Sequence, residues 1–230
     1  MSNPAGVSYC GSRYASVAEP IMSRSTCLNA ASGVLVAGLT ACGSGHEMSF
    51  FVTSVRTGDG GNLGALTCAD HHCLELATAA GSRKYEWRAY LSMTATPASA
   101  AVNARDRIGR GHWFNAKGIE VAASLDDLHG PGNRLGGRTS LDERANFVPA
   151  NAHDILTGSN PDGTAADGDS TCRNWTSTEG HAMVGHSNKV GSLGGDRVRS
   201  LNSAHLSEGC SLPALLKLGS NARLYCFALD

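Results

Sequence analysis

Histidine occurs beside serine or a carboxylate at several places in the second half of the chain: His153-Asp154, His181, His186-Ser187 and Ser203-Ala204-His205. Catalytic triads are defined by geometry and not by order along the chain, so these residues could compose a hydrolytic triad. They could equally be hydrogen-bonding groups of the core or of loops. The sequence contains no G-x-S-x-G elbow, no H-E-x-x-H pair and no P-loop. We therefore expect a protein that is not an enzyme.

A second group of chemically capable side chains lies nearer the N-terminus, where Asp70, His71, His72 and Glu75 follow one another closely. His71 and Glu75 are four residues apart, a spacing that lets two helical side chains share one zinc ion. The alternative is a solvated helix face with weak ion pairs.

The elements that must position these residues follow from hydrophobic periodicity. Residues 48–55 and 85–92 have the composition of strands, the second with Trp87 on one face and Tyr90 on the other. Residues 66–80 repeat at helical spacing, and 221–229 predict a last strand that can return beside the first. Between residues 103 and 154 the pattern breaks into short pieces separated by turns.

Length and charge limit the class of protein. The chain has 230 residues and 41% hydrophobic content, which is enough for one sizeable core and not two full domains. Its formal net charge is −1, so it has no basic field that would attract nucleic acid. We expect one folded domain and no nucleic-acid partner.

Eight cysteines without a CxxC pair favour an oxidising compartment over a cytosolic metal site. The order of four of them permits two nested bridges, Cys73 to Cys226 outside and Cys172 to Cys210 inside. On a helix, Cys68 and Cys73 would point about 140° apart, so they should not pair with each other. We predict that Cys68 is a free thiol.

An export signal is predicted at the N-terminus. Residues 22–42 combine a cation, a weak apolar stretch and small residues, and Leu39-Thr-Ala-Cys42 looks like a bacterial lipobox. The signal would then be cut before Cys42, whose thiol would carry lipid as the only membrane attachment. A soluble export signal and a coincidental match are the alternatives. We assign residues 1–46 to the signal and a linker, and residues 47–230 to the folded domain.

Seven motifs, in collinear order from about Met48 to the end, resemble the endostatin domain of collagens XV and XVIII and its bacterial relatives: CADHHC at 68–73, WRAYLS at 87–92, AVNARD at 101–106, LTGSNPDG at 156–163, CRNW at 172–175, SAHLSEGC at 203–210 and LYCF at 224–227. The resemblance implies an α+β, C-type-lectin-like fold with a mainly antiparallel sheet, a disulfide-clamped helix and long loops. It also implies the nested cysteine pairing, and a role in binding glycans, matrix or other proteins.

Calcium-dependent C-type lectins bind sugar and calcium through a Glu-Pro-Asn or Gln-Pro-Asp loop and a later Trp-Asn-Asp segment. The resemblance implies sugar contacts from Asn160, Asp162 and Asn202, and calcium ligands from Asn160, Asp162, Asp169 and Asn202. This sequence departs from the pattern, because it has leucine for the tryptophan at 201 and serine for the second acid at 203. A turn required by the backbone is the alternative. Trp113, in a glycine-flanked loop, is a candidate platform for stacking on a sugar and otherwise a core residue.

These observations predict a non-catalytic, extracytoplasmic binding domain of a bacterial lipoprotein, in the cell envelope or secreted, that recognises carbohydrate. The alternative is a protein-interaction or structural module of the envelope or matrix with no sugar or metal site. The expected partner is a glycan or an envelope protein, and calcium is the only cofactor indicated.

Overall fold

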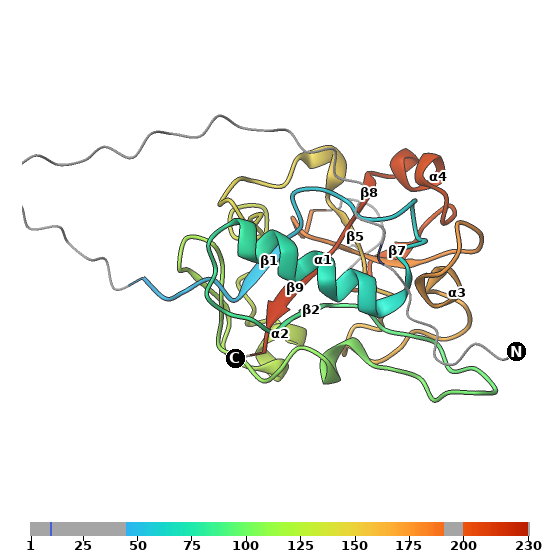
Figure 1. The fold of residues 1–230 in the computed structure, drawn as a ribbon, viewed down its shortest axis with the longest axis horizontal. Coiled ribbons are helices and arrows are strands. Elements are labelled where there is room, and N and C mark those ends of the chain that lie inside the picture. Colours follow the sequence, from blue (N-terminus) through green and yellow to red (C-terminus); the bar gives the residue numbers. More distant parts are fainter. Residues whose placement is uncertain (1–9, 11–44, 191–199, 230) are drawn as a thin grey trace, which may run out of the picture.

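The computed structural model describes Cys10 and residues 45–190 and 200–229. Within those ranges the chain alternates short strands and helices, and the fold class is α+β, as predicted (Figure 1). The elements in chain order are β1 Phe50–Val52, α1 Ala65–Ala79, β2 Trp87–Ala89, η1 Ala104–Asp106, β3 Trp113–Phe114, β4 Glu120–Ala122, α2 Leu125–His129, η2 Ala150–Ala152, β5 Asp154–Leu156, α3 Cys172–Trp175, β6 Met183–His186, β7 His205–Leu206, α4 Leu212–Lys217, β8 Ser220–Arg223 and β9 Tyr225–Ala228.

The first sheet joins the two ends of the domain. Its order is β1-β9-β2, and both pairings are antiparallel, so the last strand returns beside the first as the sequence predicts, and it also pairs with β2. Alternation along β1 and β9 divides the core: Phe51 and Cys226 pack toward α1, whereas Phe50 and Phe227 belong to a second cluster on the other face. Both faces of this sheet are therefore buried.

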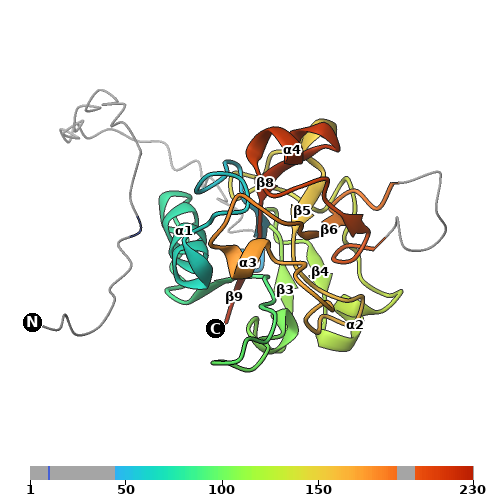
Figure 2. The same ribbon diagram turned by 90° about the vertical axis from the view of Figure 1, so that its right-hand side faces the viewer.

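Helix α1 covers one face of that sheet (Figures 1 and 2). Its buried residues recur at helical spacing and include Ala69, Cys73 and Ala77. Cys73 is bonded to Cys226 in β9, and Cys172 is bonded to Cys210 farther along the chain. The predicted nested pairing is confirmed, with the outer bridge joining the helix to the central strand.

A third disulfide corrects the prediction of a free thiol at Cys68, because Cys68 is bonded to Cys10. Helical geometry excludes only Cys73 as a partner, and Cys68 lies in the first turn of α1, where Cys10 reaches it. Three disulfides indicate an oxidising location outside the cytoplasm. The predicted signal and the lipid site at Cys42 lie outside the described residues.

Alkylation of the unreduced, unfolded chain tests the third bridge. We expect Cys10 and Cys68 to resist iodoacetamide until a reductant is added, and the variant Cys68→Ser to expose one additional thiol, at Cys10. Peptide mass spectrometry measures both. An alkylated Cys68 in the unreduced wild type would show that this bridge does not form.

No helix in the described ranges is long and apolar enough to cross a membrane.

The second sheet carries the chemistry. Its order is β7-β6-β5-β8, with β5 and β6 antiparallel and β5 and β8 parallel. The backbone of Leu201 passes very close to Gly185 in β6. A Cβ at position 185 would lie 1.8 Å from the carbonyl oxygen of Leu201, so only glycine fits there. This close approach lets residues 200–204 run beside β6, where the Ala204 N–H donates to the Val184 carbonyl oxygen at 2.7 Å.

Candidate metal centre

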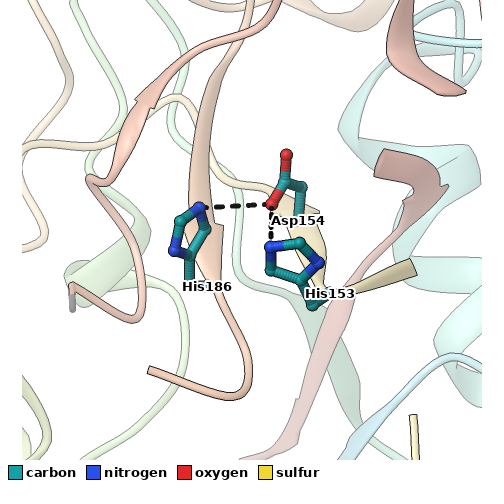
Figure 3. Close-up of side chains that lie close together, drawn as sticks. All are labelled: His153, Asp154 and His186. Carbon is teal, nitrogen blue, oxygen red and sulfur yellow. Dashed lines mark ion pairs between the residues drawn. The ribbon is translucent and has the colours of Figure 1, made fainter. Parts of the chain in front are cut away.

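Three imidazoles surround one carboxylate at the start of β5. His153 Nε2 lies 3.1 Å from Asp154 Oδ1, and His186 Nε2 lies 3.2 Å from the same oxygen. Figure 3 shows both rings directed at that oxygen. On the other side, His205 Nε2 lies 3.4 Å from Oδ2 and 3.1 Å from the Nε2 atom of His186. We refer to these four residues as the His-Asp centre.

The register of the second sheet explains how residues so far apart in sequence meet. Asp154 and His186 are direct partners across β5 and β6, so their side chains share a face. His205 is paired with Val184, two positions from His186 on β6, and is therefore its diagonal neighbour. His153 directly follows the short helix η2 and keeps helical φ and ψ (−85° and −16°), so it does not alternate with Asp154 as it would in a strand.

Burial makes the carboxylate unusual. The Asp154 side chain is 1% exposed, and all the ion pairs found for it within the described residues are with histidine. Neither of its oxygens has a hydrogen-bond partner of good geometry there. Burial, with smaller contributions from Tyr90 and Asp154, holds the pKa of the neighbouring Tyr225 well above its ordinary value, so this phenol stays neutral. A buried anion without a compensating charge is costly, and a cation at this point would offset that cost.

Backbone carbonyls determine which imidazole nitrogen faces Asp154. The Nδ1 atoms of His153, His186 and His205 lie 2.7, 3.2 and 2.9 Å from the carbonyl oxygens of Ala150, Val190 and Leu206. A carbonyl oxygen only accepts hydrogen bonds, so each Nδ1 must donate, and a neutral ring then presents the lone pair of Nε2. Metal-binding histidines typically have this arrangement, in which the distal nitrogen donates to a carbonyl or carboxylate.

Four separations in the centre, which involve both oxygens of Asp154, match those between neighbouring ligand atoms of a zinc site. Zinc bonds of about 2.0–2.1 Å place neighbouring ligand atoms of a tetrahedral site about 3.3 Å apart. The four separations given above run from 3.1 to 3.4 Å. His153, Asp154 and His186 form a compact set whose ligand atoms all lie within 4.8 Å of one another. Imidazole nitrogen suits zinc and similar transition metals, whereas calcium prefers oxygen ligands.

No protein-family model and no curated protein matches this chain. The case for the His-Asp centre therefore comes from its geometry alone.

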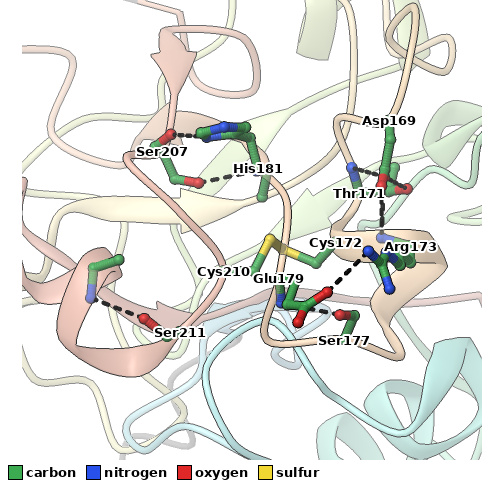
Figure 4. The surroundings of a disulfide bond; sticks show 12 residues. Asp169, Thr171, Cys172, Arg173, Ser177, Glu179, His181, Ser207, Cys210 and Ser211 are labelled. Atoms are coloured by element: carbon green, nitrogen blue, oxygen red, sulfur yellow. Dashed lines mark hydrogen bonds and ion pairs between the residues drawn. A yellow bond between two sulfur atoms is a disulfide. The ribbon is translucent and has the colours of Figure 1, made fainter.

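Sequence reasoning named all four residues of the centre but grouped them as a possible triad. The structure does not place Ser187 for that role, because its hydroxyl donates to the carbonyl oxygen of His153 at 3.1 Å. His181 is directed elsewhere, with its Nδ1 atom 2.9 Å from the carbonyl oxygen of Ser207 (Figure 4). His153, His186 and His205 lie at or beside short strand-like segments that can pair, and this pattern could have indicated that they meet.

The side chains on α1 that could share a zinc ion have different partners. Asp70 accepts from Arg107 at 2.7 and 2.8 Å, and His72 is buried with its Nε2 atom 3.1 Å from the carbonyl oxygen of Val55. His71 and Glu75 remain as an exposed pair 3.6 Å apart. This arrangement corresponds to the alternative interpretation of a helix face with ion pairs.

Of the predicted calcium ligands, Asn160 and Asn202 are brought together. The Asn202 amide nitrogen donates to the Asn160 carbonyl oxygen at 2.9 Å and to the hydroxyl of Tyr90 at the same distance. Asp162 accepts from Thr164 within the turn, through the backbone N–H at 3.0 Å. These bonds are those of a Pro-Asp-Gly turn supported by a buried amide.

Asp169, the fourth predicted calcium ligand, is used differently. One of its oxygens accepts from the N–H of Thr171 at 3.3 Å and from the N–H of Arg173 at 3.0 Å, beside the Cys172–Cys210 bridge (Figure 4). It shares no hydrogen bond with Asn160, Asp162 or Asn202 among the residues described.

Trp113 is not a platform for a sugar. Its side chain is 1% exposed and its ring packs edge-on against Phe227, with centroids 5.2 Å apart. The glycines around it suggested an open loop, but β3 pairs with β4 and turns the indole into the second core cluster. The candidate role of Trp113 as a sugar platform is therefore wrong, and the core alternative is confirmed.

The metal-free centre should have a recognisable pH dependence. The contact with the Asp154 carboxylate raises the pKa of His205 above its ordinary value of 6.5, and partial burial opposes the shift. A raised pKa in the folded state stabilises the fold at pH values below the unfolded pKa, and this contribution is lost as the pH rises through the folded pKa. With EDTA present, we expect Asp154→Asn to stabilise the protein by about 1 kcal/mol at pH 8 and to lose that advantage at pH 5.5. Urea unfolding at the two pH values measures this, and an equal effect at both would contradict it.

Proposed function

We propose that this chain is an extracytoplasmic, non-catalytic binding domain of C-type-lectin-like architecture that holds one divalent transition-metal ion in the His-Asp centre. Zinc fits the centre best. The observation that carries the proposal is the convergence of three Nε2 atoms on one buried carboxylate, with every Nδ1 atom directed to a backbone carbonyl oxygen.

Two further features support a binding role. The disulfides brace a domain whose connecting loops are long relative to its strands, which suits recognition by loops on a rigid scaffold. The ordered turn at Asn160–Asp162 is linked through Asn202 to the segment that carries His205. Carbohydrate is the ligand class that the endostatin-like motifs favour, and a lipid anchor at Cys42 would hold the domain at the bacterial envelope.

Calorimetric titration of the full chain, after removal of metal with EDTA, tests the metal. We expect one zinc ion per chain with a dissociation constant of about 1 μM or lower, because three ligands, His153, Asp154 and His186, lie within 4.8 Å of one another before binding, and no heat from calcium at millimolar concentration. Cobalt should bind at the same site. A chain that binds no zinc while remaining folded would contradict the proposal.

A glycan array tests the ligand class. Arrays probed with the zinc-loaded protein, with the EDTA-treated protein and with zinc plus calcium separate the two metals. Binding that requires zinc supports the proposed site, and binding that requires calcium and is lost in Asp162→Ala would support the lectin loop. An array without signal in all three conditions would favour the interaction module.

A further inference from the structure

We infer that a metal ion in the His-Asp centre keeps one exchangeable coordination position, occupied by His205 in the resting protein and taken by a ligand carboxylate when that ligand binds. This inference rests on the proposed metal site and names the chemistry that the site recognises.

The four residues of the centre are not held equally. His153, Asp154 and His186 form the compact set, and they come from the start of β5 and the end of β6, the two inner strands of the sheet. The side chains of Asp154 and His186 are 1% and 7% exposed. Such residues have little freedom to leave a metal ion, so this set forms the permanent part of the site.

His205 is the least constrained member. It lies in the two-residue strand β7 at the edge of the sheet, and β7 pairs with β6 alone. Its side chain is 32% exposed, and its Nδ1 contact is with the carbonyl of the next residue, Leu206, not with a separate element. Rotation of the His205 side chain would break none of the hydrogen bonds between strands.

The position of His205 is also the position that solvent can reach. Its Nε2 atom is near Oδ2 of Asp154, while His153 and His186 are both near Oδ1. A ligand arriving from the His205 side therefore meets the metal without displacing the compact set. The ring of His153, whose side chain is 23% exposed, borders the same approach.

Charge selects the kind of ligand. A divalent ion and one aspartate leave a net charge of about +1 at a partly buried point, which favours an anionic oxygen donor over a neutral hydroxyl. In the exchange, the bond from the metal to His205 Nε2 breaks and a bond to a carboxylate oxygen forms. The neutral imidazole leaves with its own lone pair, and no electron transfer or proton is required.

Cobalt loaded into the full chain gives the direct test, because the visible absorption of Co²⁺ changes with its ligands. The probe is glucuronate, and glucose is the matched neutral control. We expect glucuronate to change the cobalt bands of the wild type and glucose to leave them unchanged. Because His205 no longer competes, His205→Gln should bind cobalt within about 100-fold of the wild type and bind glucuronate about tenfold more tightly.

The outcomes distinguish a failure of the metal site from a failure of ligand exchange at His205. A folded wild type that does not bind cobalt overturns both the metal site and this inference. Cobalt binding with bands that glucuronate leaves unchanged in the wild type overturns the inference alone, whether or not His205→Gln responds, because His205 then stays on the metal. An equal response to glucuronate and glucose overturns the assignment of a carboxylate.

Discussion

Zinc affinity should fall by at least about 100-fold when His186 is replaced by glutamine. The His186 side chain is 7% exposed, and its Nε2 atom lies 3.2 Å from Asp154 Oδ1 and 3.1 Å from His205 Nε2. Glutamine has a similar length but offers an amide, which is a much poorer zinc ligand than imidazole. Calorimetric titration of the EDTA-treated variant measures the loss.

A matched control is available in the same chain. His181 also directs Nδ1 to a backbone carbonyl oxygen, that of Ser207, but lies outside the His-Asp centre. His181→Gln should therefore bind zinc like the wild type. Near-ultraviolet circular dichroism of both variants checks that their cores are intact. If His186→Gln is folded and binds zinc as tightly as His181→Gln, the His-Asp centre is not the metal site.

The sequence predicted the elements that depend on local pattern. The β-branched and aromatic composition of 48–55, the alternation in 85–92 and the helical spacing in 66–80 correspond to β1, β2 and α1. These segments are buried on one or both faces, so their hydrophobic periodicity directly reflects the fold. Cysteine order, together with the resemblance, was sufficient for the nested bridges because Cys73 faced inward on its helix.

Features that depend on tertiary contacts could not be predicted in this way. The partner of Cys68 is a distant upstream residue, and nothing in the local spacing identifies it. Trp113 is turned inward by pairing with β4, which is a tertiary contact. The His-Asp centre requires the register of β5 against β6 and the passage of residues 200–204 beside Gly185. Its four residues carry no spacing motif, because metal ligands on separate strands need none.

The Cys73–Cys226 bridge should be the largest single contribution to stability after the core itself. It closes a loop with a sequence separation of 153, for which the chain-entropy model gives about 5 kcal/mol, while the separation of 38 at Cys172–Cys210 gives about 4 kcal/mol. We expect the double variant Cys73→Ala with Cys226→Ala to lower the free energy of unfolding by about 3–5 kcal/mol. Urea unfolding monitored by tryptophan fluorescence measures the change.

The inner bridge provides the comparison, because all four cysteines are at most 1% exposed and truncation to alanine leaves similar small cavities. The difference in free energy of unfolding between the two double variants then reflects the length of the closed loop and the elements that each bridge joins. Loss of the outer bridge releases α1 from β9, so the strand between β1 and β2 loses its covalent attachment to the helix that covers it. The His-Asp centre lies in the four-stranded sheet and not in the sheet of β1, β9 and β2, so zinc affinity should remain within about tenfold of the wild type in any variant that still folds. A large loss of zinc affinity on removing Cys73 and Cys226 would instead mean that the three-stranded and four-stranded sheets are energetically coupled, and that the metal centre depends on the Cys73–Cys226 bridge.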